Sequence, residues 1–172
     1  RSSDLYFFAK TLDQVRPGGV IAFVTSRYTM DKQSPEVRRY IAQRAELLGA
    51  IRLPNNAFKA NAGTDVVSDI IFLQKPLEGA QLSSANRSWL DTADYTDKEG
   101  NVVPLNRYFV THPENMLGEF GAFGTMYRKG DTALVARDGQ NTPQLLQEAI
   151  NRLPADIMTP AVEVAPENRE TV

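Results

Sequence analysis

The polar triplet Thr25-Ser26-Arg27 stands where a binding site would be expected. It closes an unbroken apolar run that begins at Val20, and such a run is typical of a strand buried on both faces of a covered sheet. Because open α/β sheets bind ligands outside the carboxyl ends of their strands, Ser26 and its neighbours are predicted to line a substrate cleft. The alternative is an ordinary exit from the strand.

A single aromatic side chain, Phe58, lies in a loop of small and polar residues just before the apolar segment 66–73, and Lys59 follows it. Phe58 could remain exposed to meet a ligand, or it could pack down on the edge of the sheet. Lys59 and the pair Lys32-Gln33 could contact DNA phosphate, because basic side chains make many of the backbone contacts to DNA. Exposed lysines more often only solvate a surface.

Other residues whose types could take part in catalysis or binding give weaker signals. The glycines of GEFGAFG, at 118, 121 and 124, do not have the spacing of a dinucleotide-binding turn. The chain has no cysteine, which excludes disulfides and thiolate metal sites. His112 is the single histidine, and neither a metal site nor a Ser/His/Asp nucleophile can be argued from it. We expect His112 to be a capping or loop residue before a short helical turn.

The composition is that of a globular protein whose charges are nearly balanced. Of 172 residues, 42% are apolar and 23% are charged, and the net charge is -2. A basic footprint over the whole chain is therefore absent, so any contact with DNA must be local or shared with other parts. The lack of cysteine favours a reducing, cytoplasmic setting, and no apolar run approaches the ~20 residues that span a bilayer. Because the chain begins with Arg1 rather than Met, we expect it to be a piece of a longer protein.

Hydrophobic periodicity predicts alternating helices and strands in the first 76 residues. The expected elements are a helix over 3–16, a strand over 20–25, a helix that starts after Ser34 and stops at Gly49, and strands over 50–53 and 66–74. The last two strands are joined by a loop of about ten residues, whereas a parallel crossover usually needs a dozen or more. The final strand is therefore expected to run antiparallel to its neighbour, near the edge of the sheet.

The remainder of the chain has a different character. Residues 77–158 are polar and rich in turns, and we expect an irregular mixed extension with a helical turn at PENML, a strand over 132–137 and a later helix. Residues 159–172 are expected to be extended or disordered. The first structural unit is therefore expected to be residues 1–76.

The segments DLYFFAKTLDQVRPGGVIAFVTS, AIRLPNNAF and AGTDVVSDIIFLQK resemble the C-terminal half of the catalytic domain of bacterial adenine-N6 (amino-type) DNA methyltransferases. The resemblance is strongest to the large restriction-modification or mobile-element versions and covers roughly residues 4–76. It implies an α/β fold: a partial Rossmann-like methyltransferase sheet, mostly parallel with an antiparallel last strand. The family's Gly-rich cofactor turn and its Asn-Pro-Pro-Tyr-type motif would both precede this chain.

The resemblance also implies roles for single residues. The reaction would transfer a methyl group from S-adenosylmethionine to the exocyclic amine of an adenine flipped out of double-stranded DNA. Phe58 would stack on that base, which is worth about 1–3 kcal/mol, with Ser26 and Lys59 as further substrate contacts. Phe7 would line the cofactor's adenine pocket, whereas Phe8 falls on the apolar stripe of its helix and is expected in the core.

Two hypotheses follow from the sequence. In the first, the chain is part of a methyltransferase, inactive alone because the missing N-terminal half would bind most of the cofactor; no catalytic or metal-binding residue is assigned here, and a helicase or nuclease could be fused to the parent. In the second, the chain is a non-catalytic interaction or scaffold module that retains half of the fold. Such a half-sheet would expose a strand edge that needs a cover.

Overall fold

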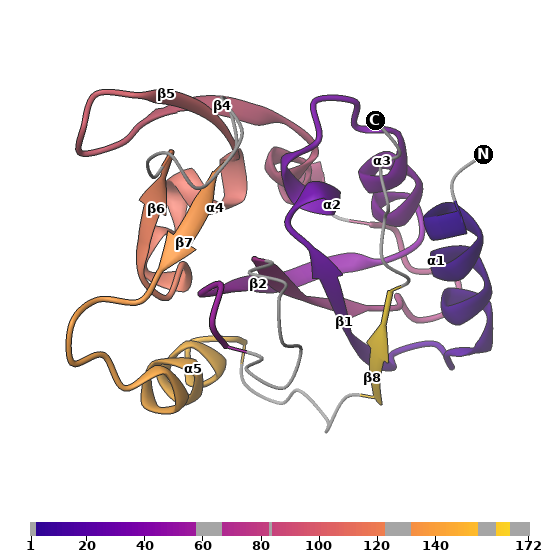
Figure 1. Ribbon diagram of the computed structural model, residues 1–172. Coiled ribbons are helices and arrows are strands. Elements are labelled where there is room, and N and C mark those ends of the chain that lie inside the picture. The colour runs from indigo at the N-terminus through magenta and orange to yellow at the C-terminus, as the bar shows by residue number, and fades with distance from the viewer. Residues whose placement is uncertain (1–2, 58–66, 83, 123–131, 155–160, 166–172) are drawn as a thin grey trace.

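A mixed four-stranded sheet forms the centre of the fold, as seen in a computed structural model (Figure 1). The structure describes residues 3–57, 67–82, 84–122, 132–154 and 161–165. In chain order the elements are α1 (Ser3–Gln14), β1 (Val20–Ser26), α2 (Tyr28–Asp31), α3 (Glu36–Ala42), β2 (Glu46–Leu53), β3 (Ser68–Gln74), η1 (Ser84–Leu90), β4 (Thr92–Thr96), β5 (Val102–Asn106), α4 (Arg107–Thr111), η2 (Pro113–Asn115), β6 (Glu119–Gly121), β7 (Ala133–Val135), α5 (Thr142–Asn151) and β8 (Ala161–Val164).

The strand order in the central sheet is β2-β3-β1-β8. β3 pairs antiparallel with both neighbours, with Phe23 opposite Ile71 on one side and Ile51 opposite Ile70 on the other. The parallel pair of this sheet joins β1 to β8. The expected partial Rossmann-like, mostly parallel sheet is therefore wrong, because antiparallel pairing predominates.

The position of β3 explains that error. β1 and β2 run in the same direction, but β3 lies between them, so they share no parallel ladder. The antiparallel direction of β3, predicted from the short loop before it, is confirmed. β3 lies directly beside edge strand β2, and β8 forms the other edge, where it pairs with β1 along residues 21–24.

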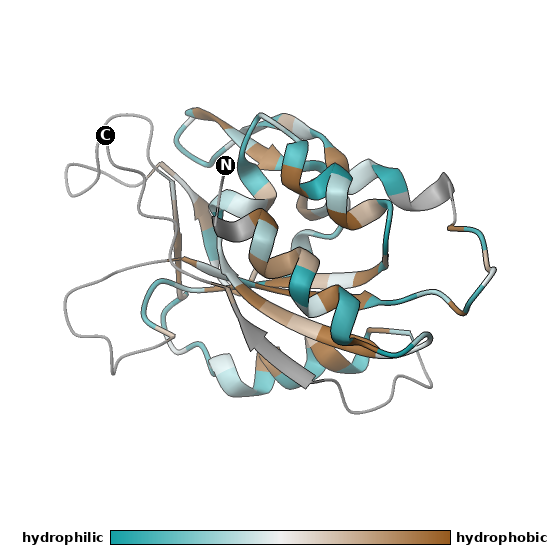
Figure 2. Cartoon of the chain, turned by 90° about the vertical axis from the view of Figure 1, so that its right-hand side faces the viewer, coloured by the Kyte–Doolittle hydropathy of each residue, from teal (hydrophilic) through white to brown (hydrophobic). Residues whose placement is uncertain are grey.

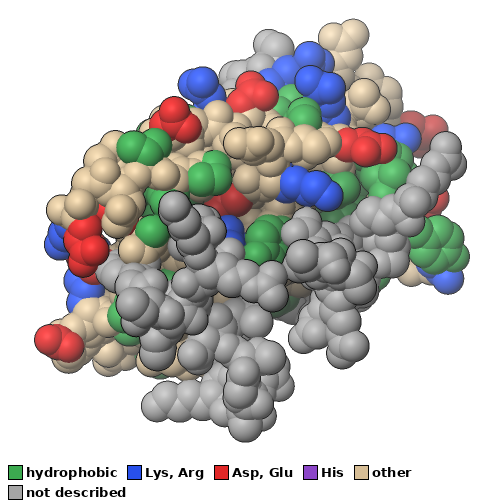
Figure 3. All heavy atoms as spheres, turned by 45° about the horizontal axis from the view of Figure 1, so that its top comes forward, with side chains coloured by type: hydrophobic (Ala, Val, Ile, Leu, Met, Phe, Trp, Pro, Cys, Tyr) green, Lys and Arg blue, Asp and Glu red, His purple; other side chains and the backbone are tan. Residues whose placement is uncertain are grey.

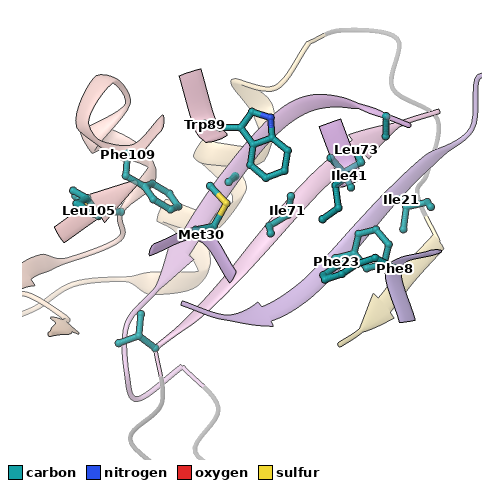
Figure 4. Close-up of a cluster of buried hydrophobic side chains, with 14 of the residues drawn as sticks. Phe8, Ile21, Phe23, Met30, Ile41, Ile71, Leu73, Trp89, Leu105 and Phe109 are labelled. Atoms are coloured by element: carbon teal, nitrogen blue, oxygen red, sulfur yellow. The ribbon is translucent and has the colours of Figure 1, made fainter. Parts of the chain in front are cut away.

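Both faces of the sheet are buried, and the alternation of side chains separates two cores. One core joins the sheet to α1, α3 and α4, and Figure 4 shows Phe8 beside Phe23, with Met30, Ile71 and Trp89 further along the sheet. The other core lies under α5. Its buried members are Ala22, Ile51, Leu53, Phe72, Leu117 and Ala149. Figure 2 shows largely apolar strands between helices that carry both hydrophilic and hydrophobic residues.

The second predicted helix is shorter than the sequence suggested. α3 begins after Pro35 and ends at Ala42, with no side-chain cap from Ser34, and β2 already starts at Glu46. Gly49, expected to stop the helix, lies inside β2 at an irregularity in its pairing with β3. Residues 46–49 were predicted to end the helix because of their helical spacing. Pairing with β3 instead places them in β2.

The C-terminal part adds two small hairpins and a helix. β4 pairs antiparallel with β5, and β6 pairs antiparallel with β7. The short turn at PENML forms η2, and the strand expected over 132–137 is β7. In Figure 1, β4–β7 and α4 lie on one side of the molecule and α1–α3 on the other.

Candidate functional site

Arg52 on β2 is fully buried and forms ion pairs with two carboxylates. Its Nε and Nη2 donate to the two oxygens of Asp69 on β3 at 2.7 and 2.9 Å, and its Nη1 donates to Asp31 on α2 at 2.8 Å. Burial raises the pKa of Asp69. Burial acts to lower the pKa of Arg52, yet the two carboxylates raise it overall. These three side chains, the Arg52 network, are engaged with one another inside the fold.

The Arg52 network fixes the segment that leads into α4. The backbone N–H of Asn106 donates to Asp31 at 3.0 Å, and its side-chain amide donates to two backbone carbonyls. The same side chain caps α4 by accepting a hydrogen bond from the N–H of Tyr108 at 2.9 Å. The guanidinium of Arg52 lies 4.5 Å from the ring centroid of Phe109. Buried charge and α4 are therefore held in one unit.

A cleft of about 600 Å³ opens where α4, η2 and the end of α5 meet the start of β2. We call it the α4–α5 cleft. It is lined by Leu47, Leu48, Ser88, Tyr108, His112, Glu114, Asn115, Arg152, Leu153 and Pro154. This volume lies within the range of small-molecule and cofactor sites.

A chain of hydrogen bonds crosses the cleft from α4 to α5. The Nδ2 of Asn115 donates to the hydroxyl of Tyr108 at 3.0 Å. The Nη2 of Arg152 donates to Oδ1 of Asn115 at 3.0 Å and to the carbonyl of Glu114 at 3.1 Å. Burial raises the pKa of Tyr108, so its phenol remains protonated at neutral pH. The polar groups of the cleft are thus held in fixed positions.

The imidazole of His112 stacks on the ring of Tyr108, with the ring centroids 4.3 Å apart and the planes 13° from parallel. Its Nδ1 lies 2.9 Å from the carbonyl oxygen of Tyr108 and 2.9 Å from the hydroxyl of Thr111. With a proton on Nδ1, this atom can donate to the carbonyl of Tyr108, and without one it can accept from the hydroxyl of Thr111. In the first tautomer, Nε2 is an acceptor.

Gly49 forms part of the packing beneath the cleft. A Cβ atom at this position would lie 2.5 Å from Cδ2 of Leu153 and 3.1 Å from the hydroxyl of Tyr108. The absence of a side chain therefore lets both groups approach β2. A glycine that looked like a helix stop instead permits this close approach.

The residues predicted from the sequence are not brought together at this cleft. Ser26 ends β1, half-buried, opposite Ser68 of β3. Phe7 packs its ring edge-to-face on Phe8 and Phe23, both at 5.8 Å, and leaves only its remaining partly exposed surface for any ligand. The cofactor role of Phe7 and the substrate role of Ser26 stay predictions. Phe8 lies in the core, as expected.

Two of the predicted contacts, Phe58 and Lys59, lie outside the described residues. Lys32 and Gln33 are exposed after α2. Figure 3 shows basic side chains interspersed with acidic and hydrophobic ones on the face in view. A contact with DNA phosphate remains a prediction for these positions.

Sequence reasoning placed His112 correctly but missed its neighbours. His112 is the C-cap of α4 and precedes η2, so its prediction as a capping residue is confirmed. The cleft joins Leu47, Tyr108 and Arg152 from three distant parts of the chain. No spacing within the sequence signals that meeting, because the pairing of β2 with β3 and the docking of α5 create it.

Within the described ranges, no group of three or more His, Cys, Asp or Glu side chains could hold a metal ion. None of the described helices combines the length and apolar character that crossing a bilayer requires.

Comparison with known proteins finds a partial similarity to a restriction-defence protein. No family model matches the chain, and no solved structure matches it significantly. Defense against restriction protein B of Escherichia phage P1 is 35% identical over 95 residues, which cover 49% of this chain and 4% of that protein. The chain therefore spans only a small part of the length of this relative.

This similarity corrects the identification made from the sequence. The resemblance to adenine-N6 DNA methyltransferases is wrong, since the relative is a restriction-defence protein and the sheet is not the expected parallel one. A connection with restriction and modification is supported in a coarser form, through that relative. S-adenosylmethionine, double-stranded DNA, a missing N-terminal half and a fused helicase or nuclease remain untested predictions of that resemblance.

Proposed function

We propose that this chain is a non-catalytic interaction module of a protein that acts in defence against restriction, and that it holds a partner protein in the α4–α5 cleft. The observation that carries the proposal is the cleft itself, built on a rigid support and lined by Tyr108, His112 and Arg152. Tyrosine and arginine are among the residues that dominate protein–protein binding energy.

The partial relative supports the biological setting of this proposal. The matched segment is a small portion of a much longer restriction-defence protein, which is the relation expected between a module and its parent. What the relative's name says of defence against restriction is transferred to this chain as part of the proposal.

The organisation of charge supports the choice of a binding role. Arg52 is paired with Asp31 and Asp69 inside the fold, where it stabilises the scaffold. In the cleft, His112 and Arg152 are instead exposed, and half-buried Tyr108 is held by Asn115 and by the cap at Asn106. Prepositioned polar and aromatic groups reduce the entropy lost on binding.

The proposal can be tested in phage P1. In one derivative this chain replaces the matching segment of Defense against restriction protein B, and in a control derivative that segment is deleted. Plating efficiency is measured on a restricting host relative to a non-restricting host. We expect the substituted phage to plate close to the parental efficiency, and the deletion derivative to be restricted.

An equal loss of plating by both derivatives, with the full-length substituted protein accumulating normally, would contradict the proposed function. Immunoblotting of the phage-infected cells provides the check on accumulation. A binding module should also retain protection when its surface is altered away from the cleft, and Lys98, which is exposed on the β4–β5 side, is a suitable position for that control.

A further inference from the structure

We infer that the α4–α5 cleft binds a peptide segment of its partner through a carboxylate group, which Arg152 pairs with at the wall of the cleft. The inference rests on the proposed function and specifies the ligand of the same site. The carboxylate can come from the C-terminus of the partner or from an acidic side chain within it.

Hydrogen-bond donors are available for a carboxylate on two sides of the cleft. An arginine carries five N–H donors, and the two bonds made by Arg152 within the cleft both use Nη2. The described part of the chain provides no acceptor for its Nε and Nη1. The hydroxyl oxygen of Tyr108 accepts from Asn115 and from the backbone of Ala50, so its own O–H remains to donate.

Two acceptors in the same cleft favour a peptide over a simple anion. In the tautomer with the proton on Nδ1, His112 donates to the carbonyl of Tyr108 and its Nε2 can accept an N–H. The carboxylate of Glu114 also lines the cleft and would repel an isolated anion. A peptide carries backbone N–H groups beside its carboxylate and can satisfy donors and acceptors together.

The apolar lining adds a requirement for an aliphatic or similar side chain next to the carboxylate. Leu47, Leu48, Leu153 and Pro154 supply this surface. Burying an aliphatic side chain of the ligand there would add hydrophobic stabilisation to the polar contacts. The ligand is therefore an acidic group flanked by an apolar residue.

The net charge of the surrounding chain does not attract a carboxylate, so the attraction depends on its direct contact with Arg152. Residues 46–172 carry eleven basic and seventeen acidic side chains, a net charge of -6, which disfavours an anion at long range. At physiological ionic strength the Debye length is about 8 Å, so distant charges are screened while a direct pair with Arg152 is not. Binding should therefore be measured at physiological salt.

Three N-acetylated tripeptides distinguish the sources of the carboxylate. They are Ala-Ala-Leu with a free C-terminal carboxylate, Ala-Ala-Leu amide, and Ala-Glu-Leu amide. Each is titrated into the ¹⁵N-labelled 172-residue chain, and backbone amide shifts are followed by NMR. We expect at least one acidic peptide to shift signals of the cleft residues. The neutral amide should bind at least about tenfold more weakly than that peptide.

Variants of Arg152 separate charge from shape. Arg152→Gln should lower the affinity for the acidic peptide about tenfold and leave the affinity for the neutral amide unchanged. Arg152→Lys should retain part of the affinity for the acidic peptide because it keeps a positive charge. Arg137→Gln is the matched control, since Arg137 is exposed and pairs with Glu119 away from the cleft. Circular dichroism confirms that each variant folds.

The inference is overturned by equal affinity for acidic and neutral peptides, by an absence of cleft shifts with both acidic peptides, or by unchanged binding in Arg152→Gln. Protection by the substituted phage without peptide binding would overturn this inference and leave the proposed function standing. Peptide binding without protection would have the opposite meaning: the ligand assignment stands and the restriction-defence role fails.

Discussion

The Arg52 network and the α4–α5 cleft use similar side chains in opposite ways. In the network, one guanidinium and two carboxylates are buried and bonded to each other. In the cleft, the bonds of the Arg152 guanidinium to other described residues go only to a carbonyl and an amide oxygen. The first cluster holds β2, β3 and α2 together, and the second leaves donor groups for a ligand.

The contrast between the buried Arg52 and the exposed Arg152 separates a charge that stabilises the fold from one that is available for binding. Removing one partner from a buried pair leaves an uncompensated charge, which is costly, whereas an exposed charge loses little when its neighbour is removed. The network and the cleft are also physically connected, because Asn106 bonds to Asp31 and caps α4. Substitutions in the two regions should therefore separate stability from binding.

The largest effect is expected from Arg52→Met. It leaves Asp31 and Asp69 buried without their cation, and the free energy of unfolding should fall by about 3–5 kcal/mol. Urea denaturation followed by circular dichroism measures the change. Arg137→Ala, which breaks an exposed ion pair, should cost less than about 1 kcal/mol. Similar losses in both variants would contradict the assigned importance of the buried network.

A smaller loss is expected from Gly49→Ala. The new Cβ would crowd Leu153 and the hydroxyl of Tyr108, and such overpacking typically costs about 1–3 kcal/mol. The end of the Leu153 side chain can move, which places the expected cost near 1 kcal/mol. In a Leu153→Ala background the same substitution should cost less. An unchanged cost in that double-mutant cycle would show that Leu153 does not set the limit.

The loop between β4 and β5 provides a test through pH. Asp97 accepts hydrogen bonds from the N–H groups of Glu99, Asn101 and Ala122. Burial acts to raise the pKa of Asp97, but these N–H groups lower it overall from its ordinary value of 3.8. A lowered folded pKa contributes stability that is present above pH 3.8 and is lost as pH falls through the folded pKa.

Asp97→Asn should therefore reduce the urea midpoint at pH 7, and the difference from wild type should shrink below pH 3.8. The urea midpoints of both proteins, measured from neutral to acid pH, give this difference directly. A difference that stays constant across that range would rule out the charged form of Asp97 as the cause.

The smallest effect is expected from Lys98→Ala. The side chain of Lys98 is 81% exposed, and Glu119 keeps its second partner, Arg137. The free energy of unfolding should change by about 0.2–1 kcal/mol at most. A loss approaching that of Arg52→Met would remove the contrast between exposed and buried charge on which the comparison depends.

Local elements were predictable where the sequence pattern and tertiary structure agree. The helix predicted over 3–16 is α1, and the strands predicted over 20–25 and 66–74 correspond to β1 and β3. The length of the loop before β3 indicated its antiparallel direction. The strand order was not predictable, because nothing in the local pattern shows that β3 lies between β1 and β2. The predicted end of the second helix was wrong because the helical spacing continues past Ala42 into residues that pair with β3 as part of β2.

The candidate site was less accessible to sequence reasoning than the fold. A lone histidine indicated a cap, and it is one, but its partners come from β2, η2 and α5. The buried Arg52 and Asp69 had no distinguishing motif, since each is one charged residue among the mainly apolar residues of its strand. Their significance depends on the register that places Arg52 opposite Asp69.

The central claim is that Arg152 in the α4–α5 cleft serves binding in restriction defence. The most direct measurement is the plating efficiency, on a restricting host, of the substituted phage P1 carrying Arg152→Gln, compared with the same phage carrying Arg137→Gln. We expect Arg152→Gln to lose protection and Arg137→Gln to retain it, with both proteins folded and equally abundant. Equal protection by the two variants would show that Arg152 does not serve binding in restriction defence.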